Sequence, residues 1–231
     1  MVEPTGRVII DQWIQAIKDT KELTVFATPR LRSSRWFKIF KDAIIEFNRL
    51  SVLHKLGVKL RETEEAPDTD GLLDGGANVQ FDFSAGTPQF RFRGTPRVSD
   101  KPFTGTGIEG LTMPVTQGGR LVKAFIFVPM FPLADDTREV GDGVKLLIAV
   151  HELVHAASGL ANEDHSPESN PDLFCGTPVG TPQFLMGATA AEDRVELRKG
   201  AQLGNGFRPP VVAPPITLSG RTAGEIQKRW R

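Results

Sequence analysis

The segment that most constrains the fold spans residues 140–159 and reads VGDGVKLLIAVHELVHAASG. Asp142 is a suitable helix N-cap, and Gly159 is a suitable stop after the last turn. Between them, apolar residues recur with the period of an α-helix and fall on one broad face: Leu146, Leu147, Val150, Leu153, Val154 and Ala157. We therefore expect a helix that packs this face in the core.

Two histidines lie at the edge of that apolar face. His151 and His155 are four residues apart, so a helix places them one turn apart on the same side. Two imidazoles in this arrangement can bind one metal ion. Glu152 projects about 100° further round the helix, where it can take a proton from a water molecule activated by zinc. The alternative interpretation is a helix beside the core with incidental histidines.

A catalytic zinc ion needs a third protein ligand and an open position. His165 follows the expected end of the helix and is the favoured third ligand. Asp164 could bind the zinc ion instead. Glu163 or Asp164 could also orient a ligand by accepting a hydrogen bond from it. Glu192, on a further helix expected at 189–203, is the remaining candidate.

The rest of the chain alternates between helical and strand patterns. Apolar spacing predicts helices at 8–19, 33–56 and 223–230, the second ending near Gly57. A period of two predicts strands at 58–63, 78–84, 89–93, 111–115 and 121–128. A proline-rich connector lies at 208–215. These patterns predict an α+β fold.

Bulk composition excludes several classes of partner. Lys plus Arg and Asp plus Glu are 28 each, so the net charge of zero gives no reason to expect a nucleic-acid or membrane partner. We see neither an apolar run of roughly 20 residues nor a secretory signal, which makes a cytoplasmic location the default expectation. The single cysteine, Cys175, excludes an internal disulfide.

The chain resembles the metzincin zinc peptidases over roughly residues 33 to 204, and among them the matrixin layout. The order of the expected elements fits that layout: a long helix, then the strands, then the helix with the histidines. That clan carries His-Glu-x-x-His-x-x-Gly-x-x-His, followed by a methionine-containing turn and a C-terminal helix. The matching positions in this chain are His151, Glu152, His155, Gly159, His165 and, in FLMGATAAEDRVEL, Met186. The glycine comes one residue later than in the clan motif, and the third histidine comes four residues later.

The resemblance implies a zinc metalloendopeptidase that hydrolyses peptide or protein substrates. His151, His155 and His165 would bind one Zn²⁺, Glu152 would be general base and then general acid, and Met186 would form the floor under the metal. The implied fold is a mixed twisted sheet with a long N-terminal helix, the active-site helix and a C-terminal helix after the methionine turn.

The implied domain organisation has three parts. These are an N-terminal helical extension at 1–32, the metallopeptidase domain at 33–205, and a connector with a short helix at 206–231. In the layout, 121–128 would be the sheet edge bordering the cleft, where an extended peptide could add as a strand. A buried core strand is the alternative for this segment, and Ile148 could equally line the cleft or pack in the core.

The chain departs from the clan in one further respect, and two alternatives to the peptidase interpretation stay open. The chain has no tyrosine, so the tyrosine that some metzincins place after the methionine turn is missing. Cys175 and His54 are interpreted as packing or surface residues rather than ligands. A zinc-binding protein without catalytic activity on the same fold is one alternative. A thermolysin-like hydrolase with Glu192 as the third ligand is the other.

Overall fold

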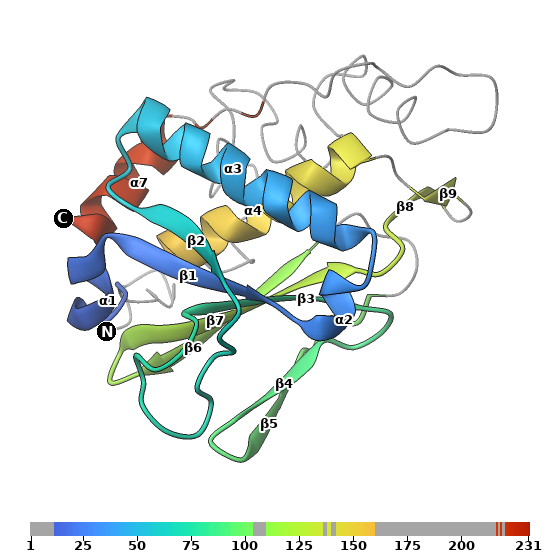
Figure 1. Ribbon diagram of the computed structural model, residues 1–231, viewed down its shortest axis with the longest axis horizontal. Coiled ribbons are helices and arrows are strands. Elements are labelled where there is room, and N and C mark those ends of the chain that lie inside the picture. The colour runs from blue at the N-terminus through green and yellow to red at the C-terminus, as the bar shows by residue number, and fades with distance from the viewer. Residues whose placement is uncertain are drawn as a thin grey trace, which may run out of the picture.

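A computed structural model describes residues 12–103, 110–135, 138–139, 142–159, 216, 218 and 220–231. The described part is an α+β fold built on one five-stranded sheet, which confirms the predicted class (Figure 1). Within these ranges, no helix combines the length and the apolar character needed to cross a membrane. The expected helix at 189–203 lies outside them.

The central sheet is mixed, with the strand order β2-β1-β3-β7-β6. Its strands are β1 (Glu22–Ala27), β2 (Lys59–Thr63), β3 (Val79–Ser84), β6 (Leu111–Gln117) and β7 (Arg120–Pro129). All neighbouring pairs are parallel except β6 and β7, which form an antiparallel hairpin. The predicted strands at 58–63, 78–84, 111–115 and 121–128 are therefore confirmed.

Strand β1 differs from the helical extension expected for residues 1–32. It lies inside the sheet between β2 and β3, and it is the strand that joins them. Residues 12–14 are also extended, because Ile14 N–H donates to Leu121 O at 3.0 Å and Leu121 N–H to Gln12 O at 3.2 Å. Helix α1 (Gln15–Thr20) consequently begins later than the pattern at 8–19 predicted.

Two long helices cover one face of the sheet (Figure 1). Helix α3 (Trp36–His54) buries the predicted apolar stripe, including Phe40, Phe47 and Leu50. Helix α4 (Asp142–Ser158) packs against α3 and against β6 and β7. The short helix α2 (Pro29–Arg32) follows β1.

The other face of the sheet is covered by a hairpin of β4 (Gln89–Phe92) and β5 (Thr95–Val98), and a second small pair joins β8 (Leu133–Asp135) to β9 (Arg138–Glu139). The Phe90 ring stacks on Phe125 of β7 with centroids 3.8 Å apart. Side chains of β7 thus enter two cores: Ala124 and Ile126 join the cluster under the helices, and Phe125 joins the one under the hairpin.

The expectation that 121–128 forms the sheet edge is wrong. β7 pairs with β3 on one side and with β6 on the other, and every residue from 121 to 129 is buried. The alternative, a buried core strand, is the observed one. In the described part of the chain the edge strand next to α4 is β6.

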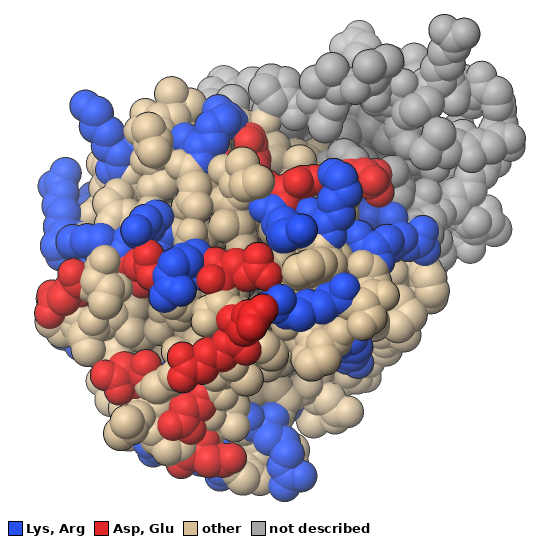
Figure 2. All heavy atoms as spheres, in the orientation of Figure 1, with Lys and Arg blue, Asp and Glu red and all other residues tan. Residues whose placement is uncertain are grey.

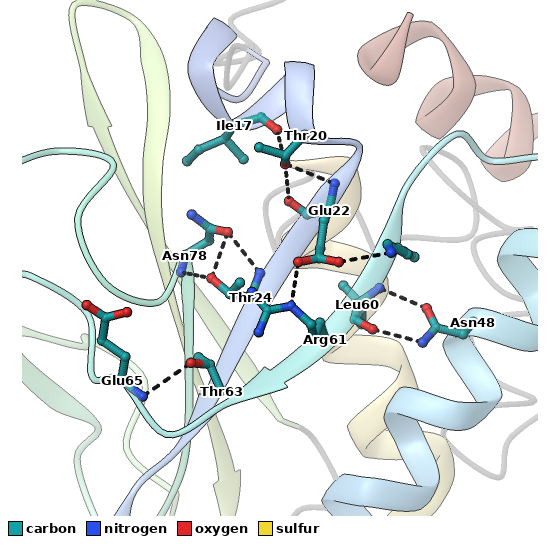
Figure 3. A network of polar contacts seen from close by, with 11 residues as sticks. Ile17, Thr20, Glu22, Thr24, Asn48, Leu60, Arg61, Thr63, Glu65 and Asn78 are labelled. Atoms are coloured by element: carbon teal, nitrogen blue, oxygen red, sulfur yellow. Dashed lines mark hydrogen bonds and ion pairs between the residues drawn. The ribbon is translucent and has the colours of Figure 1, made fainter.

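Side-chain amides fasten the first strands to their neighbours (Figure 3). Asn48 of α3 donates to Leu60 O at 2.9 Å and accepts from Leu60 N–H at 2.8 Å, so it covers backbone groups on edge strand β2. Asn78 accepts from the backbone N–H and the hydroxyl of Thr24. Burial raises the pKa of the Glu22 carboxyl, but Arg61 and Lys59 outweigh this and hold the pKa below its ordinary value.

Charged side chains of both signs are interspersed on the face drawn in Figure 2. Several of them form surface ion pairs, among them Lys38 with Asp42 and Arg61 with Glu22. Water and salt screen such exposed pairs, so they adjust stability without determining the fold.

Both ends of the described chain close on the C-terminus of α4. Trp13 Nε1 donates to Ala156 O at 3.0 Å, and Trp230 of helix α7 (Gly220–Trp230) donates to Ala157 O at 2.9 Å. These carbonyls belong to the last turn of α4, where the C=O groups have no N–H donor within the helix. Helix α7 is therefore packed into the main core rather than being a detached tail.

We predict that Trp230→Phe lowers the free energy of unfolding by about 1–3 kcal/mol, because it leaves the buried Ala157 carbonyl without its indole donor. Urea denaturation measures this change. Lys228→Ala, at an exposed position of the same helix, is the control and should change stability by no more than about 0.5 kcal/mol. Equal effects of the two substitutions would contradict the proposed role of the indole.

Candidate functional site

Helix α4 carries the site and is buried on all sides toward its C-terminus. Every residue from Leu147 to Ser158 is buried, including the polar residues His151, Glu152 and His155. A helix that is enclosed in this way carries apolar residues on all its faces. The residues next to these polar ones in the sequence are accordingly aliphatic. Ile148 belongs to the main core cluster, which favours core packing over cleft lining.

The two histidine rings face each other across one helical turn, as the spacing predicted. Their Nε2 atoms are 2.9 Å apart, and the ring planes are inclined by 77°. Two nitrogens bound to one tetrahedral zinc ion at roughly 2.0–2.1 Å would be about 3.3 Å apart. The observed separation is therefore a few tenths of an ångström shorter than that of two ligands on one zinc ion, and the Nε2 atoms would have to move apart to hold it. The observed distance suits an N–H···N hydrogen bond between neutral rings.

Glu152 lies on the side of α4 that faces strand β6. Its side chain is 1% exposed, and its Oε2 accepts a hydrogen bond from Thr112 Oγ1 at 2.6 Å. A Cβ atom added at Gly110 would lie only 2.6 Å from Glu152 Oε1, so the carboxylate rests against the start of the strand. The structure thus holds Glu152 beside the histidines and between α4 and β6.

Sequence reasoning missed Thr112 and Gly110. Both lie in or next to a segment that was correctly predicted as a strand, but nothing in its pattern says which helix it will contact. That contact follows from the antiparallel pairing of Thr112 with Ile126 of β7, which sets β6 beside α4. A search for polar residues on predicted strands would have included Thr112 without distinguishing it from its neighbours.

The remaining predicted site residues lie outside the described part of the chain. These are the ligand candidates His165, Asp164 and Glu192, the orienting candidate Glu163, and Met186, the methionine of the turn. Cys175, interpreted as a packing residue, also lies outside the described part. Among the described residues, no group of three His, Cys, Asp or Glu side chains comes together in a way that could hold a metal ion. The described part supplies two converging imidazoles and one carboxylate.

His54, the histidine outside the zinc motif, ends helix α3. Its side chain is partly buried, and burial together with the positive charge of Arg49 lowers its pKa. Its backbone carbonyl accepts a hydrogen bond from Gln227 Nε2 at 2.7 Å, which joins α3 to α7. This position agrees with the predicted packing role.

Comparison with protein-family models gives no match to this chain, and comparison with curated proteins gives none either. The chemical interpretation therefore depends on the geometry of the residues at 110–112 and 151–155.

We predict that the protein binds one zinc ion per chain and that His151→Ala or His155→Ala each weakens binding strongly. Losing a direct ligand should cost more than the roughly 10–100-fold that loss of an outer partner costs. Competition with a zinc-chelating dye measures the affinity. His54→Ala is the matched control and should bind zinc like the wild type; equal affinities for all three variants would rule out the site.

The same assay identifies the third ligand. Alanine is introduced separately at His165, Asp164 and Glu192, and the zinc affinity of each variant is compared with the wild type. We expect the largest loss for His165→Ala. A larger loss for Glu192→Ala would instead assign the thermolysin-like ligand set.

Proposed function

We propose that this protein is a zinc-dependent metalloendopeptidase of metzincin-like layout. The observation that carries the proposal is the convergence of the His151 and His155 Nε2 atoms with Glu152 next to them on one buried helix. Zinc binding needs the two imidazoles but does not need Glu152. A buried carboxylate beside the ligand pair is what hydrolysis requires in addition.

His151 and His155 would hold the zinc ion, which when bound makes a water molecule acidic near neutral pH and polarises the substrate carbonyl. Glu152 takes a proton from the water molecule as the water oxygen adds to the peptide carbonyl carbon. The C–N bond then breaks, and Glu152 returns the proton to the leaving amine nitrogen. The products are a new carboxyl group and a new amino group, with no other reactant consumed.

The layout of the described elements supports the metzincin-like assignment. A long helix, α3, precedes the sheet strands β2, β3, β6 and β7, and the helix with the histidines follows them. This is the order on which the resemblance was based. The third ligand and the methionine turn remain part of the proposal.

Strand β6 is the segment best placed to receive an extended substrate. It is one of the two edge strands of the central sheet in the described part of the chain, the other being β2, and it touches Glu152 through Thr112. A peptide that adds to a sheet edge forms backbone hydrogen bonds along its length. Those bonds would hold the peptide carbonyl groups at set positions relative to the candidate site. We therefore transfer to β6 the substrate-binding role first expected at 121–128.

We predict that the zinc-loaded wild type cleaves members of a mixed peptide library and that Glu152→Gln lowers the rate by about 10²–10⁴-fold, because glutamine cannot accept the proton. Zinc content is measured on the same samples and should be equal. Mass spectrometry of the products gives the rate and the cleavage sites.

His54→Ala is again the matched control and should cleave like the wild type. If both the wild type and Glu152→Gln bind zinc and neither cleaves any peptide, the site binds metal without catalysing hydrolysis. If Glu152→Gln cleaves as fast as the wild type, Glu152 is not the general base.

A further inference from the structure

We propose that Thr112 is a positioning residue for Glu152, and that Gly110 provides the space in which the positioned carboxylate lies. This inference rests on the proposed function, because positioning a general base matters only where hydrolysis occurs. It concerns Thr112 of β6 and Gly110 directly before the strand, which the His-Glu-x-x-His motif does not include.

The Thr112 hydroxyl has two acceptors on Glu152. Oγ1 lies 2.6 Å from the carboxylate Oε2 and 3.2 Å from the backbone carbonyl of the same residue. A hydroxyl group has one proton to donate, and the short contact to a charged oxygen is the stronger of the two. Thr112 therefore anchors one carboxylate oxygen while lying within reach of the backbone of α4.

The burial of both partners makes this contact well defined. Thr112 is 5% exposed and Glu152 is 1% exposed, so water competes little for either group. Thr112 is held in turn by the β6–β7 hairpin, where it pairs with Ile126. Contact with the central sheet therefore fixes the position of the Glu152 carboxylate, in addition to its attachment to helix α4.

Gly110 explains why the carboxylate can approach the strand so closely. A Cβ atom at this position would lie 2.6 Å from Glu152 Cγ, 2.6 Å from Oε1 and 2.8 Å from Cδ. Contacts this short force the carboxylate away from its observed place. An alanine at 110 would therefore displace the Glu152 side chain, although Gly110 lies outside the motif that carries the histidines.

The consequence for the reaction is geometric. Thr112 binds Oε2 of Glu152, and the carboxylate that it holds is the group that takes the proton of the water molecule in the proposed reaction. Because proton transfer requires hydrogen-bond distances, displacing a catalytic group by about 1 Å can cost as much as 10²-fold in rate. Thr112 and Gly110 fix the side chain that makes this transfer.

The test compares Thr112→Val with Thr112→Ser in the zinc-loaded full chain. Valine keeps the shape of threonine without its hydroxyl, whereas serine keeps the hydroxyl without the methyl group. We expect kcat to fall on the order of 10- to 100-fold in Thr112→Val, with KM and zinc affinity unchanged. Thr112→Ser should restore kcat to within a few-fold of the wild type. Thr95→Val, at an exposed position of β5, is the control for the same chemical change.

Gly110→Ala is the second variant and should lower kcat similarly while keeping the zinc affinity of the wild type. It tests the inference even if Thr112→Val does not fold. A structural measurement that is independent of activity accompanies both: crystal structures of the zinc-free proteins should show the Glu152 carboxylate displaced in Thr112→Val and in Gly110→Ala, and unmoved in Thr112→Ser.

Three outcomes would overturn the inference. One is a wild-type kcat in Thr112→Val. Another is an equal loss of kcat in Thr112→Ser, which would assign the effect to the methyl group. The third is an unmoved carboxylate in the crystal structures of both displacing variants. Failure of the proposed function looks different: the wild type itself would cleave nothing, and the position of Glu152 in the zinc-free crystals would still decide whether Thr112 holds it.

Discussion

The enclosure of helix α4 is the constraint on which the rest of the structure depends. Its C-terminal half is buried between α3 and the sheet, although it carries two histidines and a glutamate. Burying such groups is costly unless each finds a partner. The Nε2 atoms of His151 and His155 face each other, and Glu152 receives the Thr112 hydroxyl. Burial therefore accounts for the partners that these polar side chains have in the fold.

Segments distant in sequence complete this enclosure. Trp13 and Trp230 donate to successive carbonyls in the last turn of α4, one from before the first helix and one from the last helix of the chain. Each indole supplies a donor that the helix terminus lacks and a large apolar surface that fills the core. The helix that carries the candidate site is thus held at one end by both ends of the described chain and along its side by β6.

The agreement between sequence pattern and structure differs from element to element. Helix α3 matched its apolar pattern because its buried face is continuous over several turns. Strand β1 was missed because its residues do not alternate between buried and half-buried along its whole length. Val25, Phe26 and Ala27 are all buried, so the second half of the strand shows no period of two. Strand β7 was predicted correctly as a strand, but it was expected at the edge of the sheet and lies between β3 and β6. Even Lys123 within it is fully buried, with Nζ donating to Gly75 O and Ala77 O, and no feature of the local pattern indicated this burial.

The spacing of the site on its helix follows from the sequence alone. Four residues amount to about one turn, so His151 and His155 converge whatever the rest of the chain does, and Glu152 projects beside them. The residues that face Glu152, by contrast, are a result of tertiary packing. Thr112 and Gly110 reach it because β6 pairs antiparallel with β7 and so lies beside α4, and strand order depends on contacts between distant segments that no local periodicity encodes. The same reason made β6, and not β7, the edge next to the site.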